Sequence, residues 1–246
     1  MKETKKPLLY RIIKRIVRIF YKDRKVIGLE NLPNEPVIII SNHSQLHGPL
    51  SNEISYPRKK QIWCTGQVMN IKEAPKYNFN DFWSKKPKYI RWLFKLFAYI
   101  SAPLSVYIFS RADTIPVYKD SRIMSTFKET VKSLEANQDI IIFPECPIPY
   151  NDIVNEFQDK FIDVARLYYK RTKKELYFVP AYNAAKLKTI SIGKPIKFDA
   201  NVTIEEQRKT ICNYIKEQIT FLAKDLPVHK VVPYTNVGRK NYKKSK

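Results

Sequence analysis

Hydrophobic positions along this chain follow two different periods. Four short apolar runs, each bounded by turn-forming residues, have the length and composition of buried strands. Between them, apolar residues recur every three or four positions, which is the spacing of one face of a helix. Strands that alternate with helices predict a single α/β domain whose largely parallel sheet is flanked by helices. The predicted strands cover residues 37–40, 140–143, 176–180 and 189–193, and the predicted helices cover residues 121–137, 157–168 and 203–222.

The first 25 residues predict a basic amphipathic helix at the N-terminus. Such a helix can lie in the headgroup plane of an anionic membrane, or it can pack on a core with its basic face in solvent. Its cations interrupt any apolar stretch long enough for a signal peptide, so we expect the chain on the cytoplasmic side of the cell membrane. The apolar face holds Leu9, Ile12, Ile13, Ile16, Val17 and Phe20, and the cations are Arg11, Lys14, Arg15, Arg18 and Lys22.

Residues 90–109 form a second apolar segment. Its charge-free part, residues 96–109, includes Pro103 and is shorter than the ~20 residues that span a bilayer. We therefore expect it to be buried or to dip into the membrane interface, without a full transmembrane span. Residues 58–89 lack periodicity and predict an irregular excursion over the mouth of the site. The predicted division is residues 1–25 for the interfacial helix, 26–226 for the α/β domain and 227–246 for a basic, solvated tail.

Composition adds a strong charge imbalance. Lys and Arg total 45 against 23 Asp and Glu, a net charge of +22, which favours an anionic partner such as nucleic acid, anionic lipid or an acidic carrier protein. The three cysteines lack disulfide or metal-site spacing and favour a reducing compartment. Only five glycines are present and neither GxGxxG nor GxxxxGK[ST] occurs, which argues against a nucleotide-binding fold.

His43 is the first candidate for chemistry. It follows the apolar run at residues 37–40, between Asn42 and Ser44, and residues at the end of such a strand face a crevice. An imidazole there is suited to act as a general base, although a lone histidine is more often a core or surface residue. His43 and His47 would share one face of a helix and offer half of a metal site. His229 and the cysteines supply no further ligand at a suitable spacing, so we predict no metal.

Five sequence blocks in order give this chain a resemblance to the glycerolipid acyltransferases, which include the lysophosphatidic acid acyltransferases. The family carries an Asn-His-x4-Asp block after a strand, and Asn42-His43 begins a similar block here. A Gly-x-Glu-Asn phrase precedes it, and strand-end phrases of the family follow it. The blocks lie at residues 26–48, 115–119, 143–148, 179–183 and 192–196.

This chain departs from the family pattern at several positions. Gly48 stands where the family has the Asp that orients the histidine, and Ile148 and Cys146 replace the arginine and glycine of the third block. Lys119 stands where the second block usually has arginine. We expect another carboxylate to approach the His43 ring in place of the missing Asp. Glu145, at the end of a strand, is the best candidate, and Asp113 and Glu53 are weaker ones.

The resemblance implies transfer of a fatty acyl group from acyl-CoA or acyl carrier protein to the hydroxyl of a lysophospholipid such as 1-acylglycerol 3-phosphate. In that reaction His43 is the base, and Asn42 and Ser44 shape its turn. Lys119, with Arg111 and Arg122, neutralises the acceptor phosphate, and Glu145 binds the acceptor or replaces the carboxylate. The reaction needs no bound cofactor. The alternative is a catalytically inactive relative that binds lipid or, with less support, nucleic acid through its charge.

Overall fold

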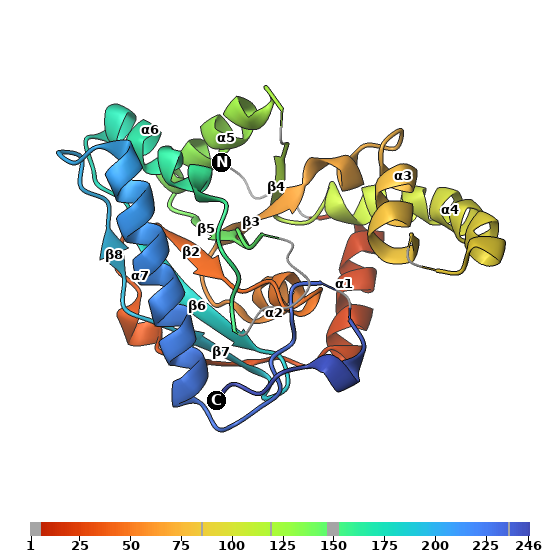
Figure 1. Cartoon of the computed structure of the whole chain (residues 1–246). Helices are drawn as coiled ribbons and strands as arrows, with labels where there is room; N and C mark the ends of the chain where they lie inside the picture. Colours follow the sequence, from red (N-terminus) through yellow and green to blue (C-terminus); the bar gives the residue numbers. More distant parts are fainter. Residues whose placement is uncertain (1–5, 85, 119, 147–152, 236) are drawn as a thin grey trace. The chain divides into compact units, whose positions relative to one another are not determined.

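The computed structural model describes residues 6–84, 86–118, 120–146, 153–235 and 237–246 (Figure 1). Residues cluster into two compact units. One comprises residues 1–21 and 63–126, and the other comprises residues 22–62 and 127–246. The N-terminal helix therefore belongs with the segment between the third and fourth strands, and the division runs through the third strand.

The α/β architecture with a largely parallel sheet is confirmed. The strand order is β1-β7-β6-β2-β5-β3-β4, with β8 paired to β6. β2 is parallel to both of its neighbours, β5 and β6, while β6 is antiparallel to β7 and β8. The strands are β1 (Lys25–Ile27), β2 (Val37–Ser41), β3 (Lys60–Thr65), β4 (Thr114–Val117), β5 (Asp139–Ile142), β6 (Tyr177–Ala184), β7 (Thr189–Ile192) and β8 (Ile196–Lys197).

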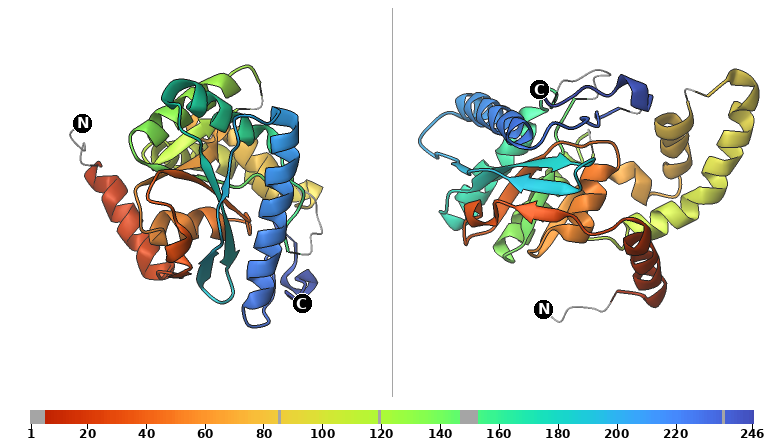
Figure 2. Two further views of the ribbon diagram at one scale, coloured as in Figure 1. Left: turned by 90° about the vertical axis from the view of Figure 1, so that its left-hand side faces the viewer. Right: turned by 90° about the horizontal axis from the view of Figure 1, so that it is seen from below.

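Helices α7 (Ile204–Asp225) and α2 (His47–Ser55) lie on opposite faces of this sheet, and α7 packs against β6 (Figure 2). Thr203 caps α7 by accepting a hydrogen bond from the Glu206 amide, as the capping box predicts. β2 is fully buried because both of its faces are covered, which explains its unbroken apolar run. The remaining helices are α1 (Leu8–Phe20), α3 (Ala74–Asn78), α4 (Arg91–Phe109), α5 (Ile123–Glu135) and α6 (Asp163–Thr172).

A buried carboxylate ties the starts of two central strands together. Asp139, the first residue of β5, accepts hydrogen bonds from the Val37 amide and the Tyr56 hydroxyl and forms an ion pair with Arg58. Because β2 and β5 are parallel and in register from this point, their carboxyl ends emerge at the same edge of the sheet.

Two segments differ from their sequence-based predictions. The irregular excursion predicted over residues 58–89 contains β3, which pairs with β5, and the short helix α3. The solvated tail predicted over residues 227–246 is instead folded: His229, Val231, Val232 and Ser245 are buried. The tail contains few apolar residues, and its burial comes from contacts distant in sequence that periodicity does not reveal.

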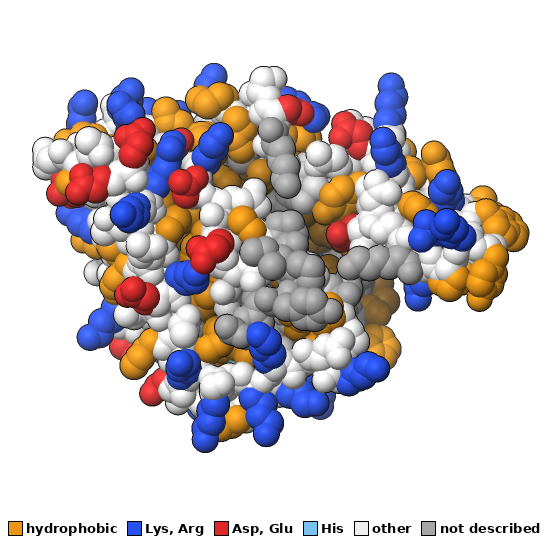
Figure 3. Space-filling view, viewed as in Figure 1, with side chains coloured by type: hydrophobic (Ala, Val, Ile, Leu, Met, Phe, Trp, Pro, Cys, Tyr) orange, Lys and Arg blue, Asp and Glu red, His pale blue; other side chains and the backbone are white. Residues whose placement is uncertain are grey.

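Segment 90–109 is helical and mostly exposed rather than buried in a core. Helix α4 presents several large apolar side chains to solvent, and Trp92 and Ile100 are each 67% exposed. Residues Lys88–Phe109 are also long and apolar enough to cross a membrane, by length and composition alone, which the count of charge-free residues had not predicted. Orange side chains gather over this helix in Figure 3.

Candidate active site

The turn after β2 carries His43 at the carboxyl edge of the sheet. Asn42 ties this turn to the neighbouring strand β6, because its Oδ1 accepts a hydrogen bond from the Asn183 amide at 2.6 Å. Within the turn, its Nδ2 donates to the Ser44 hydroxyl at 2.7 Å. Ser44 and Gln45 then adopt left-handed backbone conformations, with φ of 47° and 56°. Such conformations are costly for non-glycine residues and persist only where the surroundings hold them. Asn42 and Ser44 therefore shape the turn, as the sequence suggested.

The His43 imidazole contacts two aromatic rings. Phe143 meets it edge-on, with ring centroids 5.5 Å apart, and Tyr234 lies 4.8 Å away at a tilt of 54°. The Nδ1 atom is buried and has no hydrogen-bond partner among the described residues. Burial lowers the pKa of His43 from 6.5 to about 4. The ring is therefore a neutral imidazole at pH 7, in a form that can accept a proton.

Glu145 reaches the same turn from the end of β5 but contacts its backbone. One carboxylate oxygen accepts a hydrogen bond from the His43 amide at 2.6 Å, and the other accepts from the Asn155 amide at 3.0 Å. The side chain is 1% exposed, and burial raises the pKa of Glu145 to about 7. The expected contact between this carboxylate and the free ring nitrogen of His43 is absent from the structure. Glu145 holds the backbone that carries the ring.

Gly48 occupies a position with no room for a side chain. A Cβ atom there would lie 2.5 Å from the His43 carbonyl oxygen and 2.7 Å from the Asn42 carbonyl oxygen. The Gly48 amide also donates a hydrogen bond to the His43 carbonyl. The turn therefore closes on itself where the resembled family carries its Asp, and a carboxylate at this position is incompatible with the backbone.

The weaker carboxylate candidates have cationic partners of their own. Glu53 pairs with Lys60 at 3.7 Å, and Asp113 pairs with Lys6 at 2.8 Å. Neither pairing involves the His43 ring, whose Nδ1 is left without a partner in the described part of the chain.

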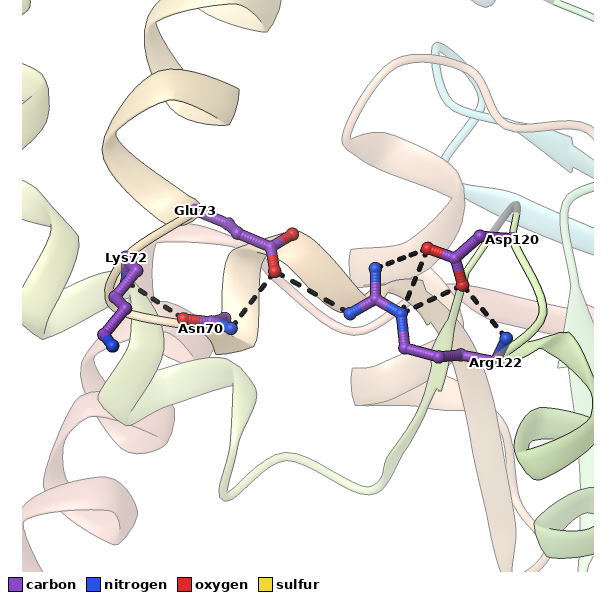
Figure 4. A network of polar contacts seen from close by, with 5 residues as sticks. All are labelled: Asn70, Lys72, Glu73, Asp120 and Arg122. Carbon is purple, nitrogen blue, oxygen red and sulfur yellow. Dashed lines mark hydrogen bonds and ion pairs between the residues drawn. The ribbon is translucent and has the colours of Figure 1, made fainter.

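The residues predicted to bind phosphate belong to the other compact unit, and Lys119 lies outside the described residues. Arg122 is already engaged: its guanidinium binds both Asp120 oxygens, approaches Glu73 and lies 3.8 Å from the Tyr118 ring centre (Figure 4). The hydrogen bonds from Arg122 lower the pKa of Asp120 to about 2. Arg111 lies 4.3 Å from the Tyr107 ring centre. An anion would compete with Asp120 for the Arg122 guanidinium.

The two other histidines do not assemble with His43 into a metal site. His47 begins α2, and its pKa is lowered by burial and by the nearby cations Arg24, Lys186 and Arg239. His229 is hydrogen-bonded to the Tyr182 hydroxyl and the Pro227 carbonyl. Across the described residues, no group of three or more His, Cys, Asp or Glu side chains is placed to hold a metal ion.

Sequence reasoning missed several neighbours of His43. Asn183 lies in the fourth block, which carried a signal for it, but its pairing with Asn42 depends on β2 and β6 being adjacent. Phe143 belongs to the third block and lies beside the imidazole because β5 neighbours β2. Tyr234 had no signal, because its segment follows the last helix and was expected to be solvated.

Stability should depend on pH through two opposing groups at this turn. The folded-state pKa of Glu145 is raised from 4.5 to about 7, so its contribution is complete below pH 4.5 and is lost as pH rises through 7. The folded-state pKa of His43 is lowered from 6.5 to about 4, so its contribution is complete above pH 6.5 and is lost as pH falls through 4. Each of these two pKa changes corresponds to roughly 3 kcal/mol in the free energy of unfolding. The two largely cancel in the wild type.

Urea unfolding of single variants between pH 4 and 7.5 separates these effects. His43→Ala should lose stability as pH rises, because only the Glu145 contribution remains. Glu145→Gln should lose stability as pH falls, because only the His43 contribution remains. If both variants keep the pH dependence of the wild type, these two groups do not control it.

Comparison with known proteins gives a match at the level of the fold. No family model matches the sequence, and no curated protein sequence matches it. Among solved structures, the chain is similar to the 1-acyl-sn-glycerophosphate (LPA) acyltransferase PlsC from Thermotoga maritima, with a TM-score of 0.52 and 14% sequence identity. The match covers 87% of this chain and 79% of PlsC. The chain therefore shares the overall fold of this structure.

Proposed function

We propose that this protein is an acyltransferase that moves a fatty acyl group from a thioester carrier to the hydroxyl of a lysophospholipid. The observation that carries the proposal is the neutral His43 imidazole, held at the end of β2 in a fold similar to that of an LPA acyltransferase. The donor is acyl-CoA or acyl carrier protein, and 1-acylglycerol 3-phosphate is the representative acceptor.

The chemistry needs a base for the acceptor hydroxyl. As the oxygen attacks the thioester carbonyl, a neutral imidazole takes its proton, and the leaving thiolate then receives a proton. His43 is uncharged at pH 7 and is available for this step. Glu145 and Asn42 keep the turn in place through its backbone, which fixes where the ring is presented. A base held in one position supplies its part of the rate acceleration without reorganisation.

The acceptor phosphate requires cations. Lys119, Arg111 and Arg122 are the proposed set, taken from the second block and its neighbours. In this role Arg122 would exchange Asp120 for phosphate, a substitution that suits a guanidinium because it binds both groups in a bidentate manner.

We place the protein at the cytoplasmic surface of an anionic membrane, bound peripherally. Support comes from the unit that holds α1 and α4, where most of the exposed large apolar side chains of the described residues lie. In α1, Leu8 and Phe20 are exposed on a helix that also carries cations. The net charge of +22, with many Lys and Arg side chains on the face drawn in Figure 3, suits anionic lipid and an acidic carrier.

A second candidate function is lipid binding without catalysis. The closed turn at Gly48 favours it, and so does Nδ1 of His43, which no carboxylate among the described residues reaches. In serine proteases, loss of the corresponding carboxylate lowers the rate about 10⁴-fold. Nucleic-acid binding through the same charge is the remaining variant of this candidate.

The test combines transfer and binding measurements. Purified protein is incubated with labelled acyl-CoA or acyl carrier protein and a panel of lysophospholipids on anionic or neutral vesicles. We expect labelled phospholipid, with more on anionic vesicles, and flotation with those vesicles. Flotation without transfer from any donor and acceptor pair would favour the lipid-binding candidate, and a salt-sensitive gel shift without flotation would favour nucleic acid.

A further inference from the structure

The C-terminal segment, residues 227–246, folds back as a paired structure. Lys230 and Lys244 form an antiparallel bridge, and the Val231 amide donates to the Lys243 carbonyl at 2.8 Å. His229 anchors the segment to the sheet, because its Nε2 lies 2.8 Å from the hydroxyl of Tyr182 in β6. Its Nδ1 lies 2.8 Å from the Pro227 carbonyl and must donate to it, so Nε2 accepts from Tyr182. The described part of the segment is thus paired with itself and tied to β6.

Between these anchors the segment reaches the turn of His43. Gln45, two residues after the histidine, donates from Nε2 to the Thr235 carbonyl at 3.3 Å and to the Tyr242 hydroxyl at 3.1 Å. Tyr234 lies beside Thr235 and places its ring 4.8 Å from the imidazole. Lys186, after β6, lies 5.8 Å from the Tyr242 ring centre and adds a further contact to the segment.

These contacts bear on the carboxylate that orients the histidine in the resembled family and is missing here. In a histidine and aspartate pair, the carboxylate fixes the orientation of the imidazole through Nδ1. Here Nδ1 has no such partner in the described part of the chain, and Gly48 leaves no room for one. The His43 ring instead contacts two aromatic rings, those of Phe143, directly after β5, and of Tyr234, from the C-terminal segment. Aromatic contacts of this kind contribute about 0.5–1.5 kcal/mol each beyond their buried area.

We propose that Tyr234 is a positioning residue, which holds the His43 imidazole by packing against it in place of a carboxylate. The C-terminal segment is then a wall of the active site rather than a tail. The inference rests on the proposed function for its catalytic consequence, but the placement of the ring can be measured whether or not the protein transfers acyl groups.

The experiment follows the His43 ring by NMR in protein labelled at histidine, together with kcat and KM. In Tyr234→Ala the imidazole should gain solvent, so its pKa should move from about 4 toward 6.5, and kcat should fall roughly ten- to hundredfold with little change in KM. Tyr234→Phe keeps the ring and should stay much closer to the wild-type values than Tyr234→Ala. Glu145 is a titratable group that binds the backbone of the same turn, so its titration is followed in the same samples.

Two further variants test whether the shift of the His43 titration is specific to the C-terminal segment. Gln45→Asn shortens the side chain that ties down the segment while suiting the left-handed backbone, and it should shift the His43 titration in the same direction by less. Tyr214→Ala, which removes a tyrosine of α7 bonded to the Lys194 carbonyl, should leave the titration unchanged. An unchanged His43 titration in Tyr234→Ala, or equal effects of Tyr234→Phe and Tyr234→Ala, would overturn the proposal. If the wild type transfers no acyl group but the His43 titration still shifts in Tyr234→Ala, the proposed function is wrong and the positioning role stands.

Discussion

Gly48→Asp is expected to destabilise the protein and to leave acyl transfer no faster than in the wild type. Any side chain at this position would place its Cβ 2.5 Å from the His43 carbonyl oxygen and 2.9 Å from the Phe143 ring. Overpacking of this kind costs about 1–3 kcal/mol, and a buried carboxylate without a partner adds to that cost. The Asp of the resembled family therefore cannot be restored by one substitution.

Urea unfolding of three variants checks this expectation. Gly48→Ala should lower the free energy of unfolding, and Gly48→Asp should lower it further. Gly238→Ala is the matched control, because the nearest atom to a Cβ there is 4.0 Å away. A folded Gly48→Asp protein that transfers acyl groups at least tenfold faster would contradict the account, since the turn would then accept a carboxylate.

Sequence patterns predicted the edge of the sheet where His43 and Glu145 meet. The apolar runs of β2 and β5 predicted parallel buried strands, and parallel strands end at one edge, so both residues had to emerge there. The hydrogen bond from the His43 amide to Glu145 confirms their adjacency. The pattern could not indicate whether the carboxylate binds the ring or the backbone, because that depends on the rotation of the peptide after Asn42.

Two other features lay beyond the sequence for different reasons. Backbone oxygens of the same turn fill the space at Gly48. This turn depends on left-handed conformations of Ser44 and Gln45, which the sequence does not indicate because neither residue is a glycine. Tyr234 reaches His43 through a segment held by hydrogen bonds to the backbone and by a buried histidine. Such contacts leave no hydrophobic period along the chain.

Helix α4 illustrates the limit of counting charges. Residues 96–109 contain no charge, but α4 begins at Arg91 and includes Lys95. The long aliphatic part of such a side chain can lie along an apolar surface while its charged end stays in water. The helix is therefore longer than the charge-free count, and its exposed apolar face could only be recognised once its neighbours were known.

His43→Ala is expected to have the largest effect on catalysis. General-base catalysis contributes about 10²–10⁴ to the rate, and the described residues around the turn offer no second imidazole or ionised carboxylate on the ring to replace it. Because the ring takes a proton only as the acceptor oxygen attacks, kcat should fall while KM changes little. His47→Gln is the matched control, since His47 begins α2 and has no assigned role in the chemistry.

The central claim is that the neutral imidazole of His43 takes the proton of the acceptor hydroxyl. Its most direct test is the rate at which labelled acyl chains appear in phospholipid on the same anionic vesicles, with the wild type, His43→Ala and His47→Gln at equal folded concentration. The account predicts a fall of about 10²–10⁴ for His43→Ala and wild-type turnover for His47→Gln. Equal turnover by the wild type and His43→Ala would contradict it.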